Sequence, residues 1–294
     1  VGPISSICHC QVSNKRMLSI SPLFSHPFSY PRRFYITATL STLLTISRFV
    51  SINSYFAGSR RMVSSFFTTR NGNGTVTVSP KVESDQSGLV VICHGLGDTA
   101  EGFVDVAQHL ASLMPHVKFV LPTAPTQRVT MNMGMPMPSW YDITGLDERS
   151  NEECKGIETS RQTITSILEA EHANTNLPYN RMVLAGFSQG GALSLYTGMQ
   201  LPSPKKLAGI VVMSGYLPHS AGFKITPDLE NTPILHCHGT ADPLVRYDMA
   251  LKTHEHLTNA GATKLSLKEY KGMQHTVLPE EIADVQKFLQ ELLP

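Results

Sequence analysis

A single serine, Ser188, stands at the centre of a five-residue pattern that is typical of nucleophilic catalysis. The pattern is Gly-x-Ser-x-Gly and covers residues 186–190. A short apolar run at 182–185 precedes it and predicts a buried strand, and residues 192–198 predict a helix. A tight turn between strand and helix exposes the serine hydroxyl near the free N–H groups of the helix start. Ser188 is therefore the candidate nucleophile, and a glycine-rich turn with an ordinary serine is the alternative.

An active serine needs a base and a group that orients the base. In hydrolases with this strand–turn–helix arrangement, the acid and then the histidine follow the serine, each after a strand. Asp242 follows a predicted strand at 233–237, and His275 follows one at 264–270. Because the carboxyl ends of parallel strands meet at one sheet edge, we predict a triad with His275 as general base and Asp242 as orienting acid. Turn and strand-end roles are the alternatives for these two residues.

Three further histidines compete for the role of base. His94 belongs to an early glycine-rich loop, and we expect its ring to hold that loop by hydrogen bonds. His236 and His238 flank the end of a predicted strand and precede Asp242, which is the wrong order for a base. His275 therefore remains the predicted base.

A tetrahedral intermediate carries an oxyanion, which needs two backbone donors. The residue after the nucleophile normally supplies one of them, so the N–H of Gln189 is the first candidate. The loop at 94–97, His-Gly-Leu-Gly, offers the second, which we assign to Leu96. Glycines on both sides of Leu96 allow the backbone to approach the site closely.

The segment 128–142 contains four methionines and the only tryptophan of the chain. Methionine side chains are flexible and polarizable, and they suit a surface that adapts to an apolar chain. We expect an acyl-binding surface here, and core filling under a long loop is an equal alternative. The residues assigned to this surface are Met131, Met133, Met135, Met137 and Trp140.

Strands and helices alternate around these residues, and a long loop is predicted at 122–150. Strands are predicted at 75–78, 89–93, 117–121, 182–185, 207–213, 233–237 and 264–270, and helices at 103–113, 152–172, 192–198, 247–259 and 280–293. This alternation indicates an α/β fold with a mostly parallel sheet covered by helices on both faces.

The net charge of +1 hides an asymmetry along the chain. Residues 1–82 hold nine Lys or Arg and no Asp or Glu, so residues 83–294 hold 15 basic and 23 acidic residues. Such an acidic body does not suggest a nucleic-acid partner. We assign residues 1–74 to an extension outside the fold and residues 75–294 to one domain. An organelle transit peptide, sequence before a true start at Met17 or Met62, and a disordered tail are the three interpretations of the extension.

Five scattered cysteines do not form a disulfide framework in a chain of this length. Reduced thiols in a reducing compartment are the simpler account. Cys8 and Cys10 flank His9 but lack a second ligand pair, so no metal site is expected. A serine triad needs neither a metal nor an organic cofactor, and none is predicted.

Several long segments resemble the acyl-protein thioesterase family, which is a branch of the α/β-hydrolase superfamily. The matching segments are 94–99, 138–142, 186–194, 238–245 and 272–275. The resemblance implies an α/β-hydrolase fold, a Ser188–Asp242–His275 triad and oxyanion donors at Leu96 and Gln189. It also places Tyr216 and Leu244 near the acyl-binding surface.

The same resemblance implies a cytoplasmic enzyme that removes palmitate from protein cysteines, and many relatives also cleave lysophospholipids and short esters. S-acylated proteins and lipid esters are the expected substrates, with transient contact to a membrane surface and a weak homodimer. A real transit peptide would place the enzyme in an organelle instead. The alternatives are a short-chain carboxylesterase, lysophospholipase or deacetylase with the same triad, and a non-enzymatic lipid-binding module.

Overall fold

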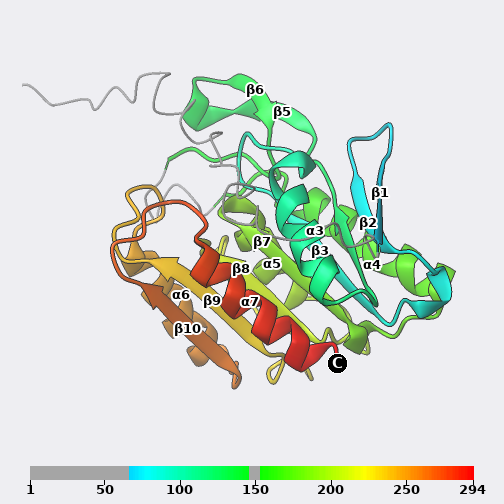
Figure 1. Cartoon of the computed structure of the whole chain (residues 1–294). Helices are drawn as coiled ribbons and strands as arrows, with labels where there is room; N and C mark the ends of the chain where they lie inside the picture. Colours follow the sequence, from blue (N-terminus) through cyan, green and yellow to red (C-terminus); the bar gives the residue numbers. More distant parts are fainter. Residues whose placement is uncertain (1–65, 146–152) are drawn as a thin grey trace, which may run out of the picture.

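The computed structural model describes residues 66–145 and 153–294. Its centre is an eight-stranded sheet with the strand order β1-β2-β4-β3-β7-β8-β9-β10 (Figure 1). The strands are β1 (Phe66–Arg70), β2 (Val76–Pro80), β3 (Gly88–Cys93), β4 (Val117–Leu121), β7 (Met182–Phe187), β8 (Gly209–Met213), β9 (Ile234–Gly239) and β10 (Leu265–Tyr270). From β4 to β10 all neighbours are parallel, and β1 and β2 join antiparallel at one edge. The predicted, mostly parallel sheet is confirmed.

Helices cover both faces of the sheet. They are α3 (Val104–Leu113), α4 (Ile157–Thr175), α5 (Gln189–Gly198), α6 (Tyr247–Asn259) and α7 (Pro279–Leu292). Helices α3 and α7 share one apolar core with the sheet, whereas α4, α5 and α6 pack on the opposite face (Figure 1). The inner strands β3, β7 and β8 are buried along their whole length. Strands buried on both faces read as continuous apolar runs, which is why the sequence located them well.

The sheet extends further toward the N-terminus than the sequence indicated. Strand β1 lies inside the segment 1–74, which the sequence analysis placed outside the fold, and it pairs with β2 from Phe66↔Pro80 to Arg70↔Val76. This edge strand is half exposed and largely polar, so it lacks the apolar pattern that reveals inner strands. The transit-peptide, later-start and tail interpretations of residues 1–65 lie outside the described residues.

The predicted loop 122–150 contains a hairpin. Strand β5 (Thr126–Val129) pairs antiparallel with β6 (Met135–Pro138), and a 3-10 turn, η3 (Thr130–Asn132), lies between them. Two prolines in β6 concealed it, because proline is tolerated only in edge strands such as this one. Part of the predicted loop, 146–150, lies outside the described residues.

Two helices begin away from their predicted starts. Helix α4 begins at Ile157 because Gly156 has a φ of 96°, which ends any helical path from earlier residues. Helix α5 begins directly after Ser188, three residues before the predicted start at 192. Across the two described ranges, no helix is both long and apolar enough to cross a membrane.

Candidate active site

Ser188 occupies a strained turn between β7 and α5. Its φ of 53° and ψ of −120° lie in a region that non-glycine residues rarely adopt. A Cβ on Gly186 would lie 2.3 Å from backbone atoms of Gly190, and a Cβ on Gly190 would lie 2.1 Å from the carbonyl oxygen of Cys93. Both glycines are therefore required by the close approach of strand and helix, as the Gly-x-Ser-x-Gly pattern predicted.

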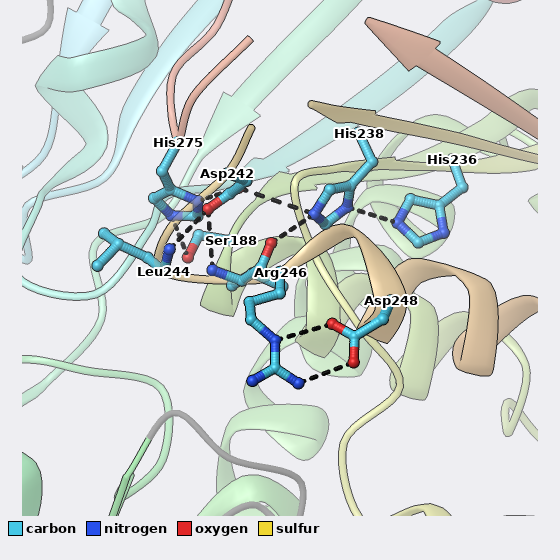
Figure 2. Close-up of polar contacts among 9 residues, drawn as sticks. Ser188, His236, His238, Asp242, Leu244, Arg246, Asp248 and His275 are labelled. Carbon is cyan, nitrogen blue, oxygen red and sulfur yellow. Dashed lines mark hydrogen bonds and ion pairs between the residues drawn. The ribbon is translucent and has the colours of Figure 1, made fainter. Parts of the chain in front are cut away.

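The three predicted triad residues form one continuous chain of hydrogen bonds (Figure 2). The His275 Nε2 atom lies 2.9 Å from Ser188 Oγ, and His275 Nδ1 lies 2.7 Å from Asp242 Oδ2. The Asp242 side chain is fully buried and that of His275 is 6% exposed. A carboxylate on Nδ1 fixes the tautomer, so that Nε2 can accept the serine proton.

The other carboxylate oxygen of Asp242, Oδ1, is also hydrogen bonded. Oδ1 accepts the N–H groups of Leu244 and Val245, each at 2.9 Å. These two amides follow Asp242 in the loop between β9 and α6 and fold back over its side chain. Leu244, one of the predicted substrate contacts, is half-buried beside the triad acid.

The loop that carries His275 is attached to the end of β9. The N–H of Ala241 donates to the carbonyl of Met273, and the N–H of Gly272 donates to Thr240 Oγ1. A Cβ on Gly239 would lie 2.2 Å from the Met273 carbonyl oxygen. Gly239 therefore lets the two loops that carry base and acid approach each other.

The loop 94–97 lies against the nucleophile, as predicted. A Cβ on Gly95 would lie 3.5 Å from Ser188 Cβ. Among the described residues, neither Leu96 N–H nor Gln189 N–H makes a hydrogen bond, which leaves both donors available to an oxyanion. Gln189 also begins α5, so the positive end of the helix dipole faces the site.

His94 braces this loop rather than acting as a base. Its Nδ1–H donates to the carbonyl of Gly95, and its Nε2 accepts the N–H of Ala124. Burial lowers the pKa of His94 to about 4, so the ring is neutral at pH 7. The expectation that this ring holds the loop by hydrogen bonds is confirmed.

The side chain of Gln189 has a second role, which the sequence analysis missed. Its Oε1 accepts the N–H of Trp140, and its Nε2 donates to the carbonyl of Tyr141 and to Ser139 Oγ. The N–H of Gly97 also donates to the carbonyl of Pro138. The segment 138–141 therefore connects the two segments that carry the predicted oxyanion donors. This segment lies about 50 residues before Gln189 in the sequence and reaches it only through tertiary packing, so no local sequence pattern predicts the contact.

The predicted acyl-binding residues fall into different environments. Met133 is 76% exposed and Met135 is 36% exposed at the tip of the β5–β6 hairpin. Met131 and Met137 are half-buried. Trp140 and Tyr216 are buried in the core under this loop. The two aromatic residues thus pack in the core and Met131 packs against it, whereas Met133 and Met135 are exposed.

The other candidate histidines and the cysteines of the described residues are buried. The two other rival histidines, His236 and His238, are buried behind Asp242 and do not contact Ser188 (Figure 2). Cys93, Cys154 and Cys237 are buried cysteines. Within the described parts of the chain, no three His, Cys, Asp or Glu side chains are grouped as metal ligands.

Comparison with known proteins assigns a family to this site. The family model for phospholipases and carboxylesterases matches residues 73–293. Acyl-protein thioesterase 1 of Mycosarcoma maydis is 39% identical over 235 residues, which cover 75% of this chain and 97% of that protein. Acyl-protein thioesterase 1 homolog 1 of Dictyostelium discoideum is 37% identical over 209 residues, which cover 71% of this chain and 92% of that protein.

A solved structure agrees with these relatives. The crystal structure of Zea mays acyl-protein thioesterase 2 matches with a TM-score of 0.65 at 28% identity, over 75% of this chain and 99% of that chain. The resemblance to acyl-protein thioesterases and the α/β-hydrolase fold are confirmed. This chain belongs to the phospholipase/carboxylesterase family and is an ester hydrolase of the α/β-hydrolase superfamily.

Proposed function

We propose that the protein is a serine hydrolase that cleaves fatty-acyl thioesters, above all S-palmitoyl groups on protein cysteines. The observation that carries the catalytic part is the continuous chain from Ser188 Oγ through His275 to Asp242, with contacts of 2.9 and 2.7 Å. The relatives named acyl-protein thioesterase support the thioester substrate.

The geometry supports a two-step acyl transfer. Ser188 Oγ attacks the acyl carbonyl carbon while its proton moves to His275 Nε2, and Asp242 stabilises the resulting imidazolium. The N–H groups of Leu96 and Gln189 bind the oxyanion. The carbon–sulfur bond breaks, the cysteine thiolate takes the proton from His275, and an acyl-serine ester remains. Water then attacks this ester with His275 again as base, which releases the fatty acid and restores Ser188.

The exposed tip of the β5–β6 hairpin supports a further part of the proposal, which is transient contact with a membrane surface. Met133 and Met135 present apolar side chains at the end of β5–β6, where they can contact an acyl chain or a lipid surface. Co-sedimentation of the protein with phosphatidylcholine vesicles, with and without Met133→Ser and Met135→Ser, tests this contact. Weak dimerisation through the site face is tested by sedimentation velocity over a range of concentrations.

The decisive experiment compares hydrolysis of palmitoyl and acetyl thioesters by the full chain at equal concentration. We expect the palmitoyl substrate to be cleaved faster and Ser188→Ala to be inactive. A serine-directed fluorophosphonate probe should label wild type and leave Ser188→Ala unlabelled. No hydrolysis and no labelling by a folded wild-type protein would contradict the proposal and favour a lipid-binding module.

A second candidate keeps the triad but prefers short acyl chains or lysophospholipids. It is favoured by the burial of Trp140 and Tyr216, together with the 2.9 Å contact between the hydroxyls of Tyr216 and Tyr141. These two predicted wall residues therefore present little apolar surface to a long chain. Preferential cleavage of the acetyl substrate in the same assay would select this candidate.

A further inference from the structure

Two histidines of β9 lie behind the Asp242 carboxylate, on the side away from His275 (Figure 2). His238 is 0% exposed and His236 is 2% exposed. Neither ring contacts Ser188, so neither can act as the base. Buried histidines require hydrogen-bond partners for their ring nitrogens, and the partners of His238 lead directly to Asp242.

The Nε2 atom of His238 lies 2.7 Å from the carbonyl oxygen of Val245. A carbonyl only accepts hydrogen bonds, so His238 Nε2 carries a proton. The N–H of the same residue, Val245, donates to Asp242 Oδ1 at 2.9 Å. His238 therefore anchors Val245, and the Val245 N–H in turn binds the Asp242 carboxylate. The His238 Nε2 atom also lies 3.7 Å from Asp242 Oδ2, so the protonated nitrogen lies close to the negative charge.

His236 supports this arrangement from the far side. Its Nε2 atom lies 3.3 Å from His238 Nδ1, and its ring also hydrogen bonds to the backbone of Gly215. Burial lowers the pKa of His236 to about 3 and also lowers the pKa of His238. Two neutral rings carry two ring protons. One is committed to Val245, so the single proton of His236 can serve either the ring–ring contact or Gly215.

The charged and titratable surroundings favour the same tautomer of His238. The Asp242 carboxylate faces Nε2, the Tyr247 ring lies 6.1 Å away, and His275 lies beyond Asp242. On the other side, His254 lowers the pKa of His236 and so disfavours a positive charge on that ring. The Asp242 carboxylate therefore attracts the proton of His238 to Nε2.

We propose that His238, in its neutral Nε2–H form, is a positioning residue for the triad: it anchors Val245 and thereby fixes the rotation of the Asp242 carboxylate toward His275. This inference rests on the proposed hydrolytic function. With Oδ1 held by two amides, Oδ2 is left to face the base. Loss of the His238 anchor frees the loop after Asp242, and the carboxylate can turn away from the imidazole.

Two variants separate a donor effect from a packing effect. His238→Leu fills the space without a donor, whereas His238→Gln places an amide N–H near the position of Nε2. His116→Leu is a matched control. The half-buried His116 ring also hydrogen bonds a carbonyl, that of Leu293. It lies at the start of β4, whereas Ser188, Asp242 and His275 follow the ends of their strands. Each variant is assayed as the full chain for kcat, KM and the pH dependence of kcat/KM, with melting temperature as the measure of folding.

In His238→Leu we expect kcat to fall on the order of a hundredfold with little change in KM, because misplacement of about 1 Å has effects of this size. The acidic limb of the kcat/KM profile should move to lower pH, because a misaligned carboxylate stabilises the imidazolium less. His238→Gln should restore most of kcat and return the acidic limb of the kcat/KM profile to its wild-type pH. His116→Leu should lower only the melting temperature. An unmoved limb in folded His238→Leu, or no rescue by Gln, overturns the proposal.

A spectroscopic measurement on wild type decides the point even if His238→Leu does not fold. In ¹⁵N-histidine-labelled protein, we expect the His238 resonances of a neutral ring protonated at Nε2 between pH 5 and 8. A ring protonated at Nδ1 overturns the proposal. Failure here leaves the proposed function intact if Ser188→Ala abolishes hydrolysis and probe labelling. If wild type itself neither hydrolyses nor labels, the proposed function fails instead.

Discussion

The indole N–H of Trp140 donates to the backbone carbonyl of His94 at 2.8 Å. The two rings also pack against each other, with centroids 5.1 Å apart. His94 opens the loop that carries Leu96, so Trp140 supports the loop of one of the two proposed oxyanion donors. The sequence analysis assigned Trp140 to the acyl-binding surface, whereas its burial and this hydrogen bond point to support of the oxyanion loop.

The first prediction separates these two roles of Trp140. Trp140→Phe keeps an aromatic ring but leaves the His94 carbonyl without its donor. Leaving a buried group unsatisfied costs about 1–3 kcal/mol, so we expect lower stability and a fall in kcat on the order of tenfold. The fall should be equal for palmitoyl and acetyl thioesters. A loss confined to the palmitoyl substrate would show that the tryptophan contacts the acyl chain.

The second prediction concerns the side chain of Gln189. Gln189→Ala retains the backbone N–H of the oxyanion site but removes the contacts to Ser139, Trp140 and Tyr141. We expect a stability loss of about 2 kcal/mol or more and a lower kcat.

Gln200→Ala is the matched control for this variant. It also removes a side-chain hydrogen bond to a carbonyl, that of Tyr196, at the far end of α5. Chemical unfolding and steady-state kinetics compare the two. Equal kinetics in both variants would contradict a role for the Gln189 side chain at the site.

The third prediction tests the contact between the loops that carry acid and base. In Gly239→Ala the new methyl group would overlap the Met273 carbonyl oxygen, so the His275 loop must shift. We expect kcat/KM to fall on the order of a hundredfold. Gly72→Ala, where no atom lies within 4 Å of the added methyl group, serves as the control. Wild-type kinetics in a folded Gly239→Ala would show that the loops can separate without consequence.

The fourth prediction concerns a buried carboxyl outside the site. Glu281, near the start of α7, is 0% exposed, and its Oε1 has no hydrogen-bond partner among the described residues. Burial raises its pKa to about 8 from an ordinary value of 4.5. Between these two values the unfolded chain binds fewer protons at this position than the folded protein. This group therefore makes stability fall as pH rises through that window, by up to about 1.4 kcal/mol per pH unit.

Glu281→Gln removes this titration and keeps an acceptor for the N–H of Leu278. We expect its stability relative to wild type to increase steadily from pH 5 to pH 8, measured by urea unfolding at several pH values. Glu280→Gln, at the exposed neighbouring position, should show the pH dependence of wild type. Parallel curves for wild type and Glu281→Gln would show that the carboxyl does not retain its proton on folding.

The hydrogen-bonded chain of Ser188, His275 and Asp242 was predictable because each of these residues follows a strand that the sequence reveals. Strands β7 and β9 are fully buried. Chain order set His236 and His238 aside as bases, and membership of the glycine-rich loop set His94 aside. The edge strand β1 and the hairpin β5–β6 were missed, because exposed and proline-containing strands lack the apolar signal on which such predictions depend.

By itself, the sequence determined the class of fold and selected the three residues of the proposed triad and the two segments of the proposed oxyanion donors, because these predictions depend on local patterns and on their order along the chain. Only the tertiary structure decided what holds them in place. The Gln189 side chain on segment 139–141, the Trp140 indole on His94 and the His238 ring on Val245 are contacts between segments brought together by packing. Burial, which gives such hydrogen bonds their strength and specificity, is a property of the whole fold.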